Sequence, residues 1–445
     1  MWDGAELRYR LAEGRGSQID WLPDGAPIGR VALTLAAMAN AQGGWLLLGV
    51  EPDTNRIVGL GDTAESVEQI LQAAEIVDPS LILPVPRALP IDGRVVLAVR
   101  VPAGLPHLYA LDGRYFIRDG SLNAPLAAPR LRRLLLERGD PGAEGDCPAG
   151  ATPNDLDLRA AAEYLEALGG PIGADPIAGL RRRGCLVVVD GRPSPTLAGL
   201  LLFGIDPQRW ATNAELRVAR HAGRTPGGQV RRESIQGRLA AQIQAATQAL
   251  GAMIAIAPAS APGWGWPASA IQELIANAVV HRDYGMREAP VHIDVFSDRL
   301  EVHSPGGLPG PVTLETLTTR RFLRNPVIAQ VLDDQGGQGV VGDGIEGLMT
   351  WAGRSGARPP VFEEAAGGVR VTLYARGERL DSLAGARREQ SRDGASPTGG
   401  GRREVQPPVA ERVGESETAS LTSGPRGTLG GGWHNRPPRR VGEHD

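Results

Sequence analysis

The sequence predicts an α+β protein of several domains, and three observations support this prediction. The chain has 445 residues, which is too long for one ordinary hydrophobic core. Helical and strand periodicities alternate along it, and hydrophobic residues make up 42% and charged residues 22%, as in globular proteins. Gly, Ser, Pro, Arg and Glu dominate residues 379–445, so a disordered tail is predicted there.

The first predicted domain covers residues 1–138 and is of α/β or α+β type. Apolar residues recur with helical spacing in two stretches, and short aliphatic or aromatic runs are typical of strands. The predicted elements are helices at 29–40 and 65–77 and strands at 45–50, 95–101 and 115–118. Asn40 and the Gly43-Gly44 turn either end the first helix in the ordinary way or belong to a functional loop.

Residues 139–155 are rich in Gly, Pro and Asp and are predicted to form a linker. The connector after it, residues 156–260, is predicted to be mainly helical. Its predicted elements are helices at 158–168, 176–184 and 232–254, a strand at 185–189 and a buried apolar run at 196–204. The helix–helix–hairpin order over residues 158–200 is compatible with a winged-helix module.

The last predicted domain covers residues 261–378. V-H-I-D-V-F and R-L-E-V-H, at 291–303, are predicted to form a β-hairpin. Glycine-rich turns follow, then a helix near 345–353 and a strand near 369–375.

The most informative segment of this domain is E-L-I-A-N-A-V-V-H-R-D-Y, at 273–284. Glu273, Asn277 and His281 are four residues apart, so a helix would place them on one face with a small drift. A carboxylate there could activate water, and an amide oxygen could hold a hard cation. The other face is apolar and can pack against a core: Ile271, Leu274, Ile275, Ala278 and Val279.

Composition excludes several classes of protein. The chain contains no lysine, whereas a Walker A loop needs one to reach the terminal phosphates, so a P-loop helicase motor is excluded. The formal net charge of −4 restricts any nucleic-acid surface to a local patch. Cys147 and Cys185 are too few for a disulfide framework, and no His or Cys spacing indicates zinc.

Targeting signals are not recognisable in the sequence. The start, M-W-D-G-A-E-L-R, is charged where a signal peptide needs an apolar run. The longest apolar stretch, residues 31–50, is interrupted by Asn40, Gln42 and two glycines, so no membrane span is predicted. We therefore expect a cytoplasmic protein without a membrane partner.

Two groups of motifs resemble known families. A-M-A-N-A-Q-G-G-W-L-L-L-G-V at 37–50, R-I-V-G at 56–59 and G-R-Y-F-I-R-D-G-S at 113–121 resemble the Schlafen-type AlbA domain. This resemblance favours the α/β type for residues 1–138. The 273–284 segment, D-R-L-E-V-H-S-P-G-G-L-P at 298–309, R-N-P at 324–326 and G-D-G-I at 342–345 resemble the GHKL-type ATPase-like domain labelled as the C-terminal region of RecG-type helicases. A-G-L-L-L-F-G-I-D-P-Q at 198–208 resembles the usual joining segment. Proteins of this architecture are regarded as transcriptional regulators.

The GHKL resemblance implies an α/β sandwich that binds ATP with magnesium. Glu273 would match the catalytic base and Asn277 the magnesium ligand. Ser304 would lie where ATPases of this class carry an aspartate that binds the adenine amino group, which weakens the case for adenine specificity. The remaining cofactor-binding candidates lie on the same helix or on two glycine loops whose amides could hold phosphates: His281, Gly306, Gly307, Gly342, Gly344 and Gly347. The alternative for each is structural, because Asn and His side chains often bond neighbouring backbone and glycines often mark turns.

Nucleic-acid binding is predicted from the AlbA resemblance, the winged-helix-like order and two arginine clusters. Arginine forms bidentate contacts with phosphate, although such clusters are often solvated helix faces paired with acids. The clustered arginines are Arg181, Arg182, Arg183, Arg320, Arg321 and Arg324. In the first domain, Ile19-Asp20-Trp21 stands where AlbA-type domains usually carry Glu-Phe-Lys, so a basic contact is lost.

The combined motifs predict a DNA-binding transcriptional regulator with a nucleotide-sensing domain, at most weakly active on ATP. RNA is an alternative partner, and a homodimer is the default assembly. One rival interpretation is a metal-dependent ribonuclease using clustered acids. The candidate acids are Glu13, Asp20, Glu51 and Asp53. The other rival is a non-catalytic dimerisation scaffold.

Overall fold

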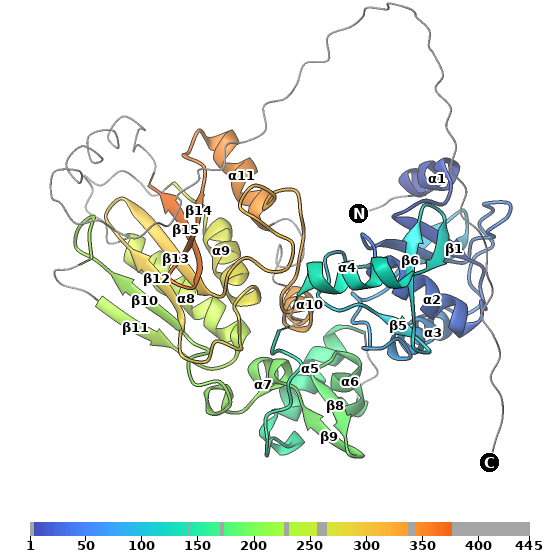
Figure 1. The fold of residues 1–445 in the computed structure, drawn as a ribbon, viewed down its shortest axis with the longest axis horizontal. Coiled ribbons are helices and arrows are strands. Elements are labelled where there is room, and N and C mark those ends of the chain that lie inside the picture. The colour runs from blue at the N-terminus through green and yellow to red at the C-terminus, as the bar shows by residue number, and fades with distance from the viewer. Residues whose placement is uncertain are drawn as a thin grey trace, which may run out of the picture. The chain divides into compact units, whose positions relative to one another are not determined.

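A computed structural model describes residues 4–139, 142–169, 173–226, 231–255, 265–336 and 344–375 (Figure 1). All of these belong to one compact unit, Met1–Val405. The predicted tail at 379–445 and the candidate Gly342 lie outside the described residues. The predicted α+β class with several sheets is confirmed.

The N-terminal part contains a four-stranded sheet in the order β1-β2-β4-β3. Strands β1 and β2 are parallel, and the other pairs are antiparallel. The strands are β1 (Ile19–Leu22), β2 (Gly44–Leu48), β3 (Arg87–Ile91) and β4 (Arg94–Val101). Alternate side chains of β2 and β4 point to opposite faces, so the sheet has two apolar cores. Helices α2 (Ile28–Ala39) and α3 (Thr63–Glu75) cover one face, and α1 (Gly4–Glu13) covers the other.

A second, three-stranded sheet packs beside α2, and Asn40 at the end of α2 is hydrogen-bonded to it and to the segment just before it. The strands are β5 (Ala110–Leu111), β6 (Arg114–Asp119) and β7 (Leu122–Pro125). The Asn40 amide donates to the carbonyl oxygens of Tyr109 (2.7 Å) and Phe116 (2.8 Å) and accepts from the Tyr109 N–H (2.8 Å). Asn40 is 1% exposed and ends α2, so the structural interpretation of this residue agrees with its geometry.

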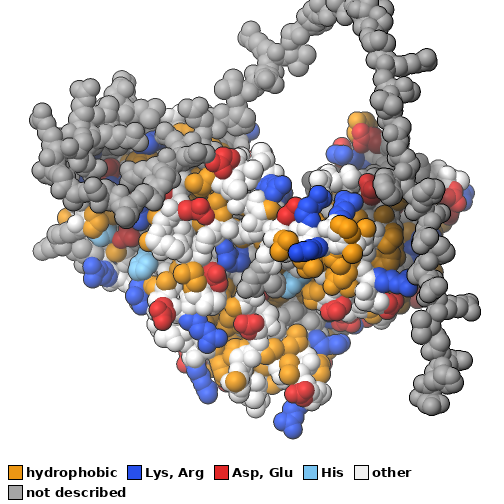
Figure 2. All heavy atoms as spheres, viewed as in Figure 1, with side chains coloured by type: hydrophobic (Ala, Val, Ile, Leu, Met, Phe, Trp, Pro, Cys, Tyr) orange, Lys and Arg blue, Asp and Glu red, His pale blue; other side chains and the backbone are white. Residues whose placement is uncertain are grey.

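Helix α4 (Ala128–Arg138) follows β7 and buries little of its surface. The side chains of Leu135 and Leu136 are 52% and 75% exposed. Figure 2 shows apolar and basic side chains interleaved over the part of the surface that α4 occupies. The exposed basic residues of this helix are Arg130, Arg132 and Arg133.

The connector has the predicted helix–helix–hairpin order. It contains η1 (Pro153–Asp155), α5 (Leu158–Ala167), α6 (Pro176–Arg182), β8 (Leu186–Val189), β9 (Arg192–Pro195), α7 (Leu197–Phe203) and η2 (Pro207–Arg209). The predicted linker at 139–155 is tied down by Glu144, which is 2% exposed. Its two carboxyl oxygens accept hydrogen bonds of 3.0 Å from the N–H groups of Val327 and Ile328, so part of this segment is packed structure.

The C-terminal part is a six-stranded sheet in the order β11-β10-β12-β13-β15-β14, with only β10 and β12 parallel among neighbours. Its strands are β10 (Leu216–Arg220), β11 (Arg231–Ile235), β12 (Val291–Val295), β13 (Arg299–Pro305), β14 (Val361–Ala365) and β15 (Gly368–Tyr374). Helices α8 (Leu239–Ala255) and α9 (Ala268–Val280) cover one face, as Figure 1 shows, with α10 (Pro326–Asp334) and α11 (Gly344–Ser355) beside α9. The predicted boundary at residue 261 therefore separates β10, β11 and α8 from the other elements of the same sheet and its covering helices.

The predicted helix at 232–254 is wrong at its start. Residues 231–235 form β11, which pairs antiparallel with β10, and the helix begins only at Leu239. Tertiary pairing overrides the helical spacing of this segment. Among the described helices, none is both long and apolar enough to cross a membrane.

Candidate functional site

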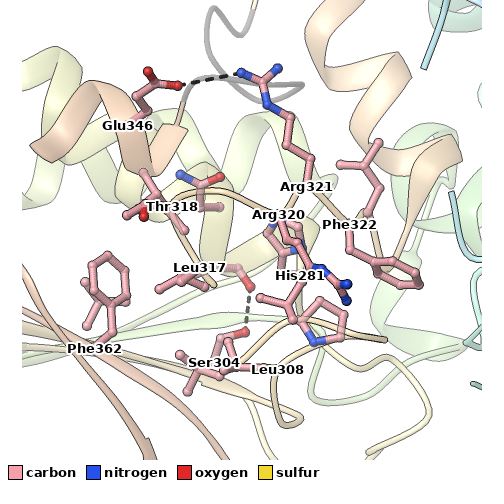
Figure 3. Close-up of a pocket in the computed structure, with 18 of the residues that line it drawn as sticks. His281, Ser304, Leu308, Leu317, Thr318, Arg320, Arg321, Phe322, Glu346 and Phe362 are labelled. Carbon is pink, nitrogen blue, oxygen red and sulfur yellow. Dashed lines mark hydrogen bonds and ion pairs between the residues drawn. The ribbon is translucent and has the colours of Figure 1, made fainter. Parts of the chain in front are cut away.

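A cavity of about 190 Å³ lies where α9, β13, β15 and the N-terminal end of α11 meet the 306–323 segment (Figure 3). Most of its wall is apolar, including Leu274, Val302 and Phe362. The cavity brings together seven of the residues predicted from the sequence: Asn277, His281, Ser304, Gly306, Gly307, Arg320 and Arg321. An apolar pocket with a few polar groups directed into it is typical of small-molecule sites.

Helix α9 presents Asn277 and His281 to this cavity. Its predicted apolar residues are buried, which fixes the rotation of the helix against the sheet. The Asn277 Nδ2 atom and the His281 Nδ1 atom are buried and have no hydrogen-bond partner within the described residues. Burial lowers the pKa of His281 to about 4, with a further contribution from the charge of Arg324, so the ring is neutral near pH 7. Asn277 therefore offers an unsatisfied amide N–H group to a ligand.

Glu273 does not line the cavity with the other two. A Cβ atom at Gly347 would lie 3.2 Å from its Oε1 atom, so the carboxylate faces α11. The reason is geometric: residues four apart on a helix drift by about 40° per step, and two steps carry Glu273 away from His281. Of the three predicted residues, Asn277 and His281 line the cavity, and Glu273 lies against the first turn of α11.

Ser304 lies at the end of β13 and is 8% exposed. Its Oγ atom donates a hydrogen bond of 2.7 Å to the carbonyl oxygen of Ala278, a bond drawn in Figure 3. The hydroxyl proton is therefore committed to α9, and only lone pairs of this oxygen can face a ligand. A serine here can accept a hydrogen bond but brings no charge, unlike the aspartate of the resembled ATPases.

The candidate glycines differ in the structural reason for glycine at each position. Gly306 has φ +99°, and a Cβ atom there would lie 2.6 Å from the Asp283 Cβ, so glycine is needed for the turn itself. Gly344 and Gly347 lie in the first turn of α11, where backbone N–H groups have no partner inside the helix. Ile345 and Glu346 of this turn line the cavity. The α11 N-terminus is thus a donor-rich part of the wall.

Two arginines of the second predicted cluster, Arg320 and Arg321, line the cavity. Arg320 Nη1 donates to the carbonyl oxygen of Pro311 (3.1 Å), and Arg321 lies 3.7 Å from Glu346. Figure 3 shows Arg321 reaching toward Glu346 and Arg320 pointing the other way. Arg324 does not line the cavity; it pairs with Asp283 at 3.2 Å.

The other predicted cluster, Arg181 to Arg183, is engaged within the protein. Arg182 bonds Glu68 at 2.6 Å and Glu75 at 3.2 Å. Arg183 is 7% exposed and pairs with Asp334. Arg181 is the most exposed of the three and lies 3.7 Å from Glu75. These guanidinium groups are paired with acids or buried. The cluster therefore mainly links α6 to α3 and α10 through ion pairs.

The acids proposed for a ribonuclease do not form a recognisable centre. Asp20 is 4% exposed and pairs with Arg118 at 2.6 Å. Among the described residues, no group of three or more His, Cys, Asp or Glu side chains is placed to hold a metal ion. Arg118 comes from β6, so a buried arginine–aspartate pair holds the small sheet against β1.

Comparisons with known proteins agree with this architecture. Residues 15–127 match the family model "Schlafen, AlbA_2", and residues 288–373 match the family model "Putative ATP-dependent DNA helicase recG C-terminal". No curated protein matches the chain.

Two solved structures are similar to parts of the chain. The DIP2311 protein from Corynebacterium diphtheriae is 24% identical with a TM-score of 0.45, covering 85% of this chain and 82% of its own. The N-terminal domain of a RecG-related protein from Nitrosomonas europaea is 25% identical with a TM-score of 0.23, covering 29% of this chain and 92% of its own. The family matches show that this chain joins a Schlafen AlbA_2 domain to a domain of the recG C-terminal, ATPase-like family.

Proposed function

We propose that this protein is a cytoplasmic DNA-binding transcriptional regulator that senses a nucleotide, ATP with magnesium, in the cavity beside α9. The two domain families are those of nucleic-acid- and ATP-related proteins. The observation that carries the proposal is the convergence of Asn277, Ser304 and the 306–307 turn on one cavity. These residues come from separate stretches of the chain, and together they occupy the positions that the GHKL resemblance assigns to cofactor binding.

The residues fit a nucleotide in part. The Asn277 Nδ2 atom has no partner within the described residues, and a flip of the side-chain amide would put its oxygen there, where it would hold magnesium. The N–H groups at the start of α11 would hold phosphate oxygens. Magnesium, when bound, would neutralise phosphate charge. Glu273 faces α11 instead of the cavity, so the proposed role is binding, and hydrolysis is at most slow.

DNA contact is proposed for α4, which follows the AlbA_2 domain. Three of its four arginines, Arg130, Arg132 and Arg133, are exposed. Arg133 lies 3.5 Å from Glu137 in a surface ion pair on the same helix, whereas Arg182 and Arg183 pair with acids of other elements. Exposed guanidinium groups on one helix suit phosphate contacts, which dominate DNA affinity and make it salt-dependent.

Calorimetry and gel shift test the proposal. Heat on titrating ATP into the protein with magnesium, but not without it, would support nucleotide sensing; no heat with ATP, ADP or GTP would contradict it. Retardation of duplex DNA that is lost when the three α4 arginines are changed to Gln would support DNA binding. Cleavage of RNA in the same incubation would instead favour the ribonuclease.

A further inference from the structure

The cavity is completed by the N-terminal AlbA_2 domain. Arg100, Pro102 and Ala103, at and just beyond the end of β4, line it together with the residues of the ATPase-like domain. Arg100 is exposed at the end of β4, on the same face of the strand as Val96 and Ala98, which pack against α1. A ligand in the cavity would therefore meet both domains.

A backbone contact holds the two sides of the cavity together. The Leu323 N–H donates a hydrogen bond of 2.8 Å to the carbonyl oxygen of Gly104. Gly104 has φ +68°, and a Cβ atom there would lie 2.0 Å from the Arg321 carbonyl oxygen. This approach is available only to glycine, and it fixes the segment carrying Arg320 and Arg321 against the end of β4.

The charged groups of the cavity are mostly cationic. Three arginines and one acid, Glu346, are among the described lining residues. Arg100 also neighbours Asp333 of α10: burial raises the pKa of Asp333, and the charges of Arg100 and Arg87 oppose that rise. Of these two arginines, Arg100 lines the cavity and Arg87 does not.

We infer that Arg100 is a ligand-binding residue, supplied by the AlbA_2 domain to an anionic group of the nucleotide. The guanidinium group would form charge-assisted, bidentate hydrogen bonds with a phosphate. Ligand binding then ties the end of β4 to the 318–323 segment, so occupancy of the cavity fixes the AlbA_2 domain against the ATPase-like domain. This inference rests on the proposed nucleotide function and adds that the site spans two domains.

The test compares Arg100→Gln with Arg87→Gln in the full-length protein. Both arginines neighbour Asp333, but only Arg100 lines the cavity, so Arg87→Gln controls for the lost attraction to Asp333. Calorimetry with MgATP should show about 10-fold weaker binding or more for Arg100→Gln, the size of one charge-assisted hydrogen bond. Binding by Arg87→Gln should stay within about 2-fold of wild type, as for distant surface charges.

Hydrogen exchange separates ligand contact from a merely structural effect. At saturating MgATP, the wild type should gain protection both at residues 304–307 and at residues 100–104. Arg100→Gln should keep the first and lose the second. Equal affinities of Arg100→Gln and wild type, or unchanged protection at 100–104, would overturn the inference and leave nucleotide sensing intact. Failure of the wild type itself to bind MgATP would remove the proposed function.

Discussion

Asn277 shows what helical spacing can predict at the scale of one residue. Its spacing within the 273–284 motif predicted a polar side chain facing a ligand; in the structure Asn277 lines the cavity, and its buried Nδ2 atom has no partner within the described residues. His281 also lines the cavity. Glu273 does not, because small rotations per residue accumulate along a helix and packing decides which residue faces the opening.

Replacing Asn277 by Ala tests whether this amide binds the cofactor. Removal of a metal ligand should lower the magnesium-dependent affinity for ATP by at least about 10-fold, the usual scale for disturbing a metal site. Calorimetry at equal nucleotide and varied magnesium measures this.

Asn325→Ala is the matched control, because the Asn325 amide donates to the carbonyl oxygens of Val280 (2.6 Å) and Arg282 (2.8 Å) and does not line the cavity. It should lower the melting temperature through lost hydrogen bonds. If Asn277→Ala behaved like this control, losing stability and keeping its affinity, the role of Asn277 would be structural.

At the scale of elements, the periodicities were informative wherever one face of an element is buried. Helix α2 and strand β4 match their predicted ranges closely because burial follows the apolar pattern. Strand β11 was missed because its residues R-R-E-S-I carry one buried side chain, and pairing with β10 alone makes them extended. Glu144 was assigned to a linker because nothing in local composition reveals a partner in α10.

The start of α10 gives a prediction about pH. Burial raises the pKa of Glu144 to about 8, and the hydrogen bonds from Val327 and Ile328 only partly oppose the rise. Between about pH 4.5 and pH 8, Glu144 is therefore protonated in the folded protein and ionised in the unfolded chain. The free energy of unfolding should fall as the pH rises through this window.

Glu144→Gln should flatten that profile, because the amide keeps an acceptor oxygen and cannot ionise. Urea denaturation at about pH 5 and about pH 8 measures the difference. Glu137→Gln, at an exposed glutamate of α4, should keep the wild-type slope. Parallel profiles for Glu144→Gln and the wild type would show that Glu144 does not cause the pH dependence.

The turn after β4 gives a second prediction at this scale. Gly104→Ala should destabilise the protein by more than the roughly 1–2 kcal/mol expected for a left-handed alanine, because the new methyl group would also overlap the Arg321 carbonyl oxygen. Gly113→Ala is the control: Gly113 has φ +70°, and nothing lies within 4 Å of a Cβ placed there.

Chemical denaturation ranks the two variants, and hydrogen exchange at residues 318–323 should rise only in Gly104→Ala. Similar destabilisation of both variants would mean that the contact between Gly104 and Arg321 contributes little.

At the scale of the whole molecule, the sequence motifs identified both domain families but could not place one domain against the other. The arginine cluster at 181–183 illustrates the limit: its charge indicated nucleic acid, but Glu68, Glu75 and Asp334 neutralise it through contacts distant in sequence. The role of Arg100 was missed for the same reason, since a single arginine in a strand carries no local signal.

A nucleotide in the cavity is proposed to control DNA binding. Fluorescence anisotropy of labelled duplex DNA, titrated with the protein with and without saturating MgATP, tests it most directly. Adding MgATP should change the Kd for DNA by at least about 5-fold in the wild type, within the usual range of coupling between two sites, and should leave the Kd of Asn277→Ala unchanged. An unchanged Kd in wild-type protein shown by calorimetry to be saturated with MgATP would contradict it.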